Sequence, residues 1–141
     1  MIGMILIAHA RIADEMVVAA EHVLGKQPLL ASLNVVDSDK PDQLQDELSQ
    51  LIRQTDTGNG VLILADMFGG TPCNVALSCA EPGRVEVLSG FNLPALIKAL
   101  SLRTQSDDLK EIASDVLQSA QQYICMSSSY LESRNEGSDH A

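Results

Sequence analysis

Residues 61–74, which read VLILADMFGGTPCN, constrain the fold of this chain more than any other stretch. The apolar run 61–65 follows a glycine and predicts a strand that is buried on both faces of a sheet. Asp66 ends this run, and after two glycines Thr71 and Pro72 suit the N-cap and the first turn of a helix. We therefore expect a carboxylate at the carboxyl end of a central strand, facing a glycine-lined helix start. Open α/β sheets bind their ligands at such edges.

The rest of the chain alternates between predicted strands and helices. Apolar or alternating runs predict strands at residues 1–8, 29–36 and 84–89, and apolar residues at helical spacing predict helices at residues 12–24, 41–52, 71–80, 93–100 and 109–120. Residues 123–126 could add a short last strand. This order predicts an α/β fold with a doubly wound, mainly parallel sheet and right-handed crossovers. We expect one domain over residues 1–127, followed by a polar tail at residues 128–141 that is frayed from residue 135.

Composition excludes several classes of function. Hydrophobic residues make up 45% of the 141 residues, which is not typical of a disordered chain, and aromatic residues only 3%, which argues against stacking of nucleic-acid bases. The formal net charge of −10 disfavours nucleic acid and anionic membranes and favours partners with a basic face, although solubility alone explains it equally well. Three cysteines without metal-binding spacing indicate reduced thiols. The apolar run of residues 1–8 is too short for a signal peptide or a membrane span, so we expect a cytoplasmic protein without membrane insertion.

His9 and Asp66 are the candidate catalytic residues. His9 follows the first predicted strand and Asp66 follows the third, so their side chains are expected to meet at one edge of the sheet. A carboxylate that holds one ring nitrogen of a histidine fixes the tautomer and orients the second nitrogen, which suits a nucleophile, a general base or a metal ligand. A lone histidine is more often a structural loop residue, but the acid and the glycine turn favour a functional role here. Two ligands are too few for zinc, and HExxH, CxxC and GxSxG motifs are absent, so we expect no metal, no cofactor and no serine hydrolase.

Gly69, Gly70 and Thr71 are the candidate phosphate-binding residues. A glycine turn at a helix start offers backbone amides, which suit an anion. The turn matches neither a Walker loop nor a GxGxxG motif, so it gives little support to nucleotide binding. With His9 opposite, it is expected to hold a phosphoryl group attached to the histidine.

These residues resemble a known family. His9 before an amphipathic helix, together with the motif Asp66-x-Phe68-Gly69-Gly70-Thr71-Pro72-x-Asn74, is similar to the mannose-type EIIA domain of the bacterial phosphoenolpyruvate–sugar phosphotransferase system over about residues 1–127. The resemblance implies a flavodoxin-like fold with helices on both faces of the sheet. It also implies a phosphotransferase component in which the phosphocarrier HPr phosphorylates His9 at Nε2 and an EIIB protein receives the group for sugar uptake. Asp66 would orient the ring and Thr71 would donate a hydrogen bond to phosphoryl oxygens. Members of the family form homodimers by exchanging a short C-terminal strand, here residues 121–126.

Two departures from the family pattern leave alternatives open. Ala10 stands where the family usually has glycine, and it would cost roughly 1 kcal/mol if that position has a positive φ. We expect no EIIB domain in this chain, so it could feed a separate EIIB protein or act as a regulatory phosphoacceptor whose phosphorylation state controls partner binding. A flavodoxin-like module for a nucleotide or a flavin is a third interpretation, which the scarcity of aromatic residues disfavours.

Overall fold

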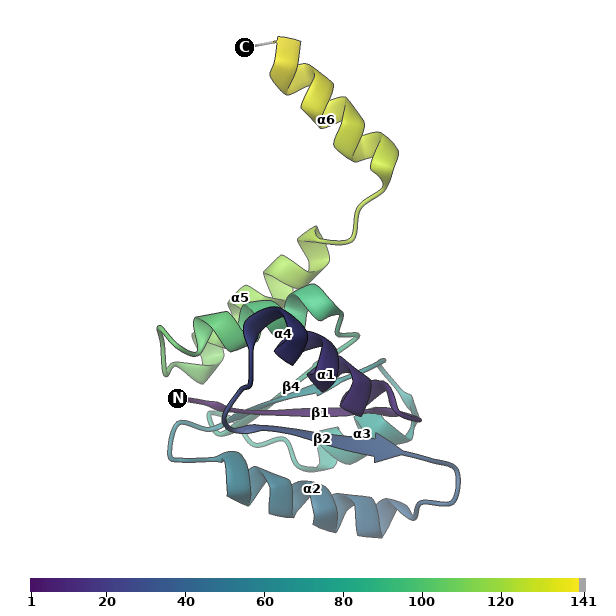
Figure 1. The fold of residues 1–141 in the computed structure, drawn as a ribbon. Coiled ribbons are helices and arrows are strands. Elements are labelled where there is room, and N and C mark those ends of the chain that lie inside the picture. Colours follow the sequence, from purple (N-terminus) through teal and green to yellow (C-terminus); the bar gives the residue numbers. More distant parts are fainter. Residues whose placement is uncertain (140–141) are drawn as a thin grey trace.

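The computed structural model describes residues 1–139, and side chains as far as residue 134. A four-stranded sheet forms its centre, in the order β2-β1-β3-β4, and every neighbouring pair of strands is parallel (Figure 1). The strands are β1 (Gly3–His9), β2 (Leu30–Val35), β3 (Val61–Ala65) and β4 (Val85–Ser89). This order is that of a flavodoxin-like, doubly wound sheet without its fifth strand.

Helices cover both faces of the sheet. They are α1 (Ile12–Leu24), α2 (Pro41–Thr55), α3 (Gly70–Ser78), α4 (Leu93–Leu102), α5 (Leu109–Gln122) and α6 (Ser127–Asp139). α1, α4 and α5 lie on one face, and α2 and α3 lie on the other (Figure 1). The predicted α/β architecture with helices on both faces is therefore confirmed. Among residues 1–139, no helix is long and apolar enough to cross a membrane.

The two faces of β1 and β3 bury separate aliphatic cores. Met4 and Leu6 of β1 contribute to the core under α1, α4 and α5, whereas Ile5 and Ile7 contribute to the core under α2 and α3. All four side chains are fully buried, because successive residues of a strand point to opposite faces and both faces are covered. The continuous apolar runs in the sequence are explained by this double burial.

The start of α3 differs from the sequence expectation. We expected Thr71 as the N-cap, but Gly69 is the N-cap residue and the helix already begins at Gly70. Both glycines have a positive φ, 84° and 79°, which turns the chain sharply enough for helical hydrogen bonding to begin before Thr71. No side chain caps this helix, so the amides of its first turn stay without a side-chain acceptor.

The C-terminal segment also differs from the expectation. Residues 123–126 form no strand within this chain, and Ser127–Asp139 is a helix where we expected a polar tail frayed from residue 135; residues 140–141 lie outside the described part. α6 extends away from the sheet and the helices that cover it (Figure 1). Its sequence is polar but contains no proline, so local propensity permits a helix without a buried face.

A buried arginine joins three segments at the amino edge of the sheet. The side chain of Arg103, only 2% exposed, donates hydrogen bonds to the carbonyl oxygens of Ile2 (3.3 Å), Leu29 (3.1 Å) and Pro28, and to Oε1 of Gln27 (3.4 Å). Burial lowers the pKa of this guanidinium. Because these acceptors lie just before β1 and in the loop before β2, Arg103 fixes the start of β1 against that loop.

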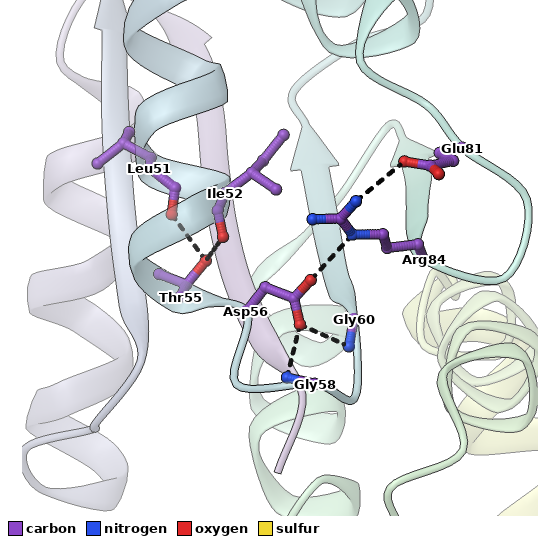
Figure 2. Close-up of polar contacts among 8 residues, drawn as sticks. All are labelled: Leu51, Ile52, Thr55, Asp56, Gly58, Gly60, Glu81 and Arg84. Atoms are coloured by element: carbon purple, nitrogen blue, oxygen red, sulfur yellow. Dashed lines mark hydrogen bonds and ion pairs between the residues drawn. The ribbon is translucent and has the colours of Figure 1, made fainter.

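Asp56 closes the loop between α2 and β3 at the same edge (Figure 2). Its carboxylate accepts hydrogen bonds from the amides of Gly58 (2.9 Å) and Gly60 (3.1 Å) and from Nε of Arg84 (3.2 Å). Arg84 also pairs with Glu81 at 3.6 Å. The hydrogen bond from Gly58 is the main cause that lowers the pKa of the Asp56 carboxyl.

Candidate functional site

His9 and Asp66 lie at the carboxyl edge of the sheet, between its two central strands. His9 is the last residue of β1, and Asp66 directly follows β3. From β1 the chain crosses to β2 on one side, and from β2 it returns to β3 on the other side, so the strand order reverses between β1 and β3. Ligands of doubly wound sheets bind at this reversal point.

The Asp66 carboxylate holds both the backbone and the ring of His9. Asp66 Oδ2 accepts a hydrogen bond from the backbone N–H of His9 at 2.9 Å and lies 2.8 Å from Nδ1 of the same residue. Asp66 Oδ1 accepts from the backbone N–H of Met67 at 3.0 Å. An ionised carboxylate only accepts hydrogen bonds, so Nδ1 carries the hydrogen and Nε2 of a neutral ring keeps its lone pair.

The two side chains differ in exposure. The His9 side chain is 45% exposed, whereas that of Asp66 is 12% exposed. The ring therefore presents its free edge outward while the carboxylate stays shielded behind it. This arrangement suits a nucleophile that must meet a large partner.

Gly70 lies against the free edge of the His9 ring. A Cβ atom placed on Gly70 would lie 3.4 Å from Cε1 and 3.5 Å from Nε2 of His9. Gly70 has φ 79°, and the uncapped start of α3 begins at this residue. Amides at a helix start favour an anion, so an anionic group on Nε2 would face favourable dipoles.

Thr71 is exposed, and the structure records no hydrogen bond between its hydroxyl and His9. It instead lines a shallow groove of about 300 Å³ between α2 and α3, together with Pro41, Gln45 and Asn74. Gly69 and Gly70 thus form the turn beside the histidine, whereas Thr71 lies one step further along the helix.

Ala10 has a left-handed backbone conformation, with φ 52°. Its N–H donates a hydrogen bond to the carbonyl oxygen of Val35 at 2.9 Å, which ties the residue after His9 to β2. Because φ is positive at this position, alanine costs roughly 1 kcal/mol there relative to glycine.

Sequence reasoning missed a polar cluster that joins α1 to β2. Ser32 Oγ and Asn34 Nδ2 donate to the two carboxylate oxygens of Asp14, at 2.6 and 2.8 Å, and the Asp14 N–H donates to Asn34 Oδ1 at 3.3 Å. The hydrogen bond from Ser32 is the larger cause, and that from Asn34 the second, of a lowered pKa for the Asp14 carboxyl. Asparagine is uncommon in strands, so Asn34 within a mostly apolar run was the available signal.

Met67 and Phe68 follow Asp66 and are exposed, at 53% and 78%. Neither side chain therefore joins the core of this chain. Cys73 is fully buried and packs as a small core residue.

Fold and site together define a flavodoxin-like α/β protein that carries a histidine–aspartate pair at the reversal point of its sheet. The chain belongs to the EIIA-man family, described as "PTS system fructose IIA component", whose model matches residues 3–117.

Known relatives agree with this family. The chain is 30% identical over 133 residues to the "PTS system fructose-specific EIIA component" of Bacillus subtilis (strain 168), a match that covers 94% of this chain and 90% of that protein. It is 28% identical over 112 residues to the "PTS system mannose-specific EIIAB component" of Escherichia coli (strain K12), covering 79% of this chain and 35% of that longer protein. Among solved structures, the phosphotransferase system component EIIA from Streptococcus agalactiae matches with a TM-score of 0.82 and 28% identity, covering 92% of this chain and 99% of that one.

Proposed function

We propose that this protein is a phosphohistidine relay component of a phosphoenolpyruvate-dependent phosphotransferase system. It accepts a phosphoryl group from HPr on Nε2 of His9 and passes the group to an EIIB protein for sugar uptake. The observation that carries this proposal is the 2.8 Å contact between His9 Nδ1 and Asp66 Oδ2, which leaves the exposed Nε2 with its lone pair. Membership of the EIIA family supports it independently.

In the proposed transfer, Nε2 of His9 attacks the phosphorus of a phosphohistidine on the donor. The bond from Nε2 to phosphorus forms while the bond from phosphorus to the donor's ring nitrogen breaks, and the electron pair of the broken bond stays on that nitrogen. Phosphoryl transfer asks a protein mainly for alignment and charge stabilisation. Asp66 supplies both, because it orients the ring and stabilises the positive charge that the ring gains. Transfer to the EIIB protein reverses these roles.

Gly69, Gly70 and Thr71 receive the phosphoryl oxygens in this proposal. Backbone amides at the uncapped start of α3 donate hydrogen bonds to them, and the Thr71 hydroxyl turns toward the group once it is attached. Hydrogen bonds to charged groups contribute about 1.5–3 kcal/mol each, so two or three suffice to hold the group in place. The proposed chemistry requires no further cofactor.

A homodimer is part of the proposal. β4 is an edge strand, and a groove of about 440 Å³ runs between it and α5. Three apolar residues of the segment 121–126 are exposed on the single chain: Tyr123 at 61%, Ile124 at 78% and Met126 at 70%. Exchange of this segment between two copies would bury these side chains and pair the open edge of β4.

We also infer a phosphoacceptor domain over residues 1–127 and a cytoplasmic location. The family match over residues 3–117 lies within that range, and α6 extends away from the sheet (Figure 1). The free cysteines, two of them at least partly buried, fit a reducing compartment.

Phosphorylation by purified components tests the proposal. The protein is incubated with phosphoenolpyruvate, enzyme I and HPr, and we expect an acid-labile, alkali-stable phosphate on one histidine. His9→Ala abolishes the label, whereas His22→Ala, which removes an exposed histidine on α1, keeps it. A label that persists in His9→Ala would refute the assignment.

Asp66→Asn is the second arm of the same experiment. Its amide can donate to Nδ1 and thereby favour the ring tautomer that has its hydrogen on Nε2, where no lone pair remains for attack. We expect transfer to slow by about 10- to 100-fold with the fold intact, as is typical when the partner of a functional histidine is lost. An unchanged rate would remove Asp66 from the mechanism.

A further inference from the structure

We infer that Asn34 is a positioning residue for His9, an inference that rests on the proposed function. Asn34 caps α1 from the neighbouring strand β2, and in this way it holds the strained turn that carries the histidine. Asp14 is its partner in the cap.

The first observation is that α1 has no cap of its own. Arg11 occupies the N-cap position, and its side chain caps no amide of the helix. The acceptor comes from β2 instead, because Asn34 Oδ1 accepts the N–H of Asp14 at 3.3 Å. Asn34 Nδ2 donates back to Asp14 Oδ2 at 2.8 Å, so the two residues are joined by a reciprocal pair of hydrogen bonds. Side-chain caps of this kind satisfy amides that a helix start leaves without a partner.

The second observation is the register of β2 against β1. Asn34 pairs with Ala8 and Val35 pairs with His9, so the cap lies beside the very end of the strand that carries the histidine. Ala8 faces the apolar core under α1, whereas Val35 belongs to the core on the other face. Asn34 therefore places an amide group on the face where β1 presents aliphatic side chains, and within the described chain that amide is used by Asp14, which Ser32 of the same strand also contacts.

The third observation is the backbone strain at Ala10, which lies between two hydrogen bonds to β2. Ala10 has φ 52°, a conformation that costs an alanine free energy. β2 holds the turn on both sides of the strain, through Val35 O before α1 and through Asn34 within its first turn. Strained backbone persists only where its surroundings fix it from several directions.

Loss of the Asn34 tether acts on His9 through the backbone. With the first turn of α1 released, Ala10 can relax, and the His9 N–H and ring, which share one oxygen of Asp66, shift together. Small displacements of a reacting group cost large factors in rate, because attack requires alignment.

The test uses the full chain with Asn34→Ala and two readouts. The first is the rate of phosphoryl transfer from phosphorylated HPr, which we expect to fall about tenfold, a modest loss for a misplaced nucleophile. The second is the ¹⁵N chemical shifts of the unphosphorylated His9 ring at alkaline pH. These report the tautomer, and we expect the form with hydrogen on Nδ1 to lose population to the form with hydrogen on Nε2.

Ser32→Ala is the matched control, because it removes a hydrogen bond to the same Asp14 carboxylate and leaves the acceptor of the Asp14 N–H in place. We expect it to keep the wild-type tautomer. Ala10→Gly added to Asn34→Ala should restore both rate and tautomer, since glycine accepts a positive φ without strain. Where Asn34→Ala does not fold, Asn34→Val removes the cap with a residue that favours strands.

A wild-type rate and tautomer in Asn34→Ala would overturn the inference. So would a slower transfer with an unchanged tautomer and no rescue by Ala10→Gly, because that combination marks a general loss of stability. The tautomer is measured without any phosphorylation, so it tests the positioning role even if no phosphate reaches His9. Failure of this inference is thereby distinguished from failure of the proposed function.

Discussion

Ala10 carries strain at the residue that follows the proposed nucleophile. Its φ of 52° lies in the left-handed region, where the Cβ of an L-residue crowds the backbone. Glycine has no such conflict. This chain therefore keeps a residue that stiffens the turn and costs stability.

Ala10→Gly should raise the free energy of unfolding by about 1 kcal/mol, because relief of strain exceeds the added freedom of the unfolded chain. Urea denaturation measures the change. Ala19→Gly within α1 is the control, and there we expect a loss of about 1 kcal/mol, since glycine disfavours a helix interior. Equal losses in both variants would contradict the strain at Ala10.

Gly70 sets the space at the free edge of His9. Gly70→Ala would place a methyl group 3.4 Å from Cε1 of His9, whereas Gly69→Ala imposes similar backbone strain with no atom within 4 Å of its Cβ. We expect both variants to lose similar stability, and transfer to fall about tenfold further in Gly70→Ala because the product is crowded. Parallel measurement of thermal unfolding and of the phosphorylation rate separates the two effects. Equal phosphorylation rates in Gly70→Ala and Gly69→Ala would contradict the expected crowding, because they would show that a methyl group fits beside Nε2 of His9.

Among the elements, the loop between α2 and β3 depends on one carboxylate. Asp56 satisfies two loop amides and holds Arg84 at the start of β4 (Figure 2). Hydrogen bonds, first that from Gly58, lower the pKa of this carboxyl below its ordinary value of 3.8. A carboxyl with a lowered pKa in the folded state binds protons more readily when unfolded. Its contribution is therefore complete above the unfolded pKa and is lost as the pH falls through the folded one.

Asp56→Asn should accordingly flatten the acid limb of the stability curve. At neutral pH we expect the variant to be less stable by about 1 kcal/mol, since an amide replaces a charged acceptor. Between about pH 5 and pH 2 the wild type should lose more free energy of unfolding than the variant, so the gap narrows. Urea denaturation at a series of pH values measures both curves. Curves that stay parallel throughout would contradict a role for this ionisation.

Local sequence patterns predicted the strands and helices whose apolar residues are buried inside a single copy of the chain. The double burial of β3 is readable from its run of five apolar residues, and the pairing of His9 with Asp66 follows from two strand ends that parallel topology brings together. The pairing of Asp14 with Asn34 was not readable, because the register of β2 against β1 decides which residues of two elements meet. The exact start of α3 depended on the φ values of two glycines, which composition does not reveal.

At the scale of the whole molecule, the sheet ends in an unpaired strand while an apolar segment lies exposed. β4 has a neighbour on one side only within the described chain, and the segment 121–126, whose first two residues still belong to α5, has its large side chains in solvent. A strand predicted there has no partner inside the described chain, and residues 124–126 have no regular secondary structure in a single copy. A second copy is the proposed partner.

Ile124→Asp should weaken self-association by about 100-fold or more, because a carboxylate would be buried without a partner. Sedimentation equilibrium over a range of concentrations measures the change. Val18→Asp is the control, since Val18 is similarly exposed, at 61%, but lies on α1. A wild-type protein that stays monomeric, or an Ile124→Asp variant that associates like wild type, would contradict the exchange.

One oxygen of Asp66 is hydrogen-bonded to both the backbone N–H and the ring of His9, which restricts the movement of the ring during the proposed relay. A side chain anchored in this way cannot swing from one docked protein to another like the arm of a carrier. The donor protein and the recipient protein must therefore bind, one after the other, to overlapping surfaces around Nε2 of His9. The rate of the relay would then depend on how fast each partner protein dissociates. An excess of the donor protein would inhibit binding of the recipient protein, and an excess of the recipient would inhibit binding of the donor.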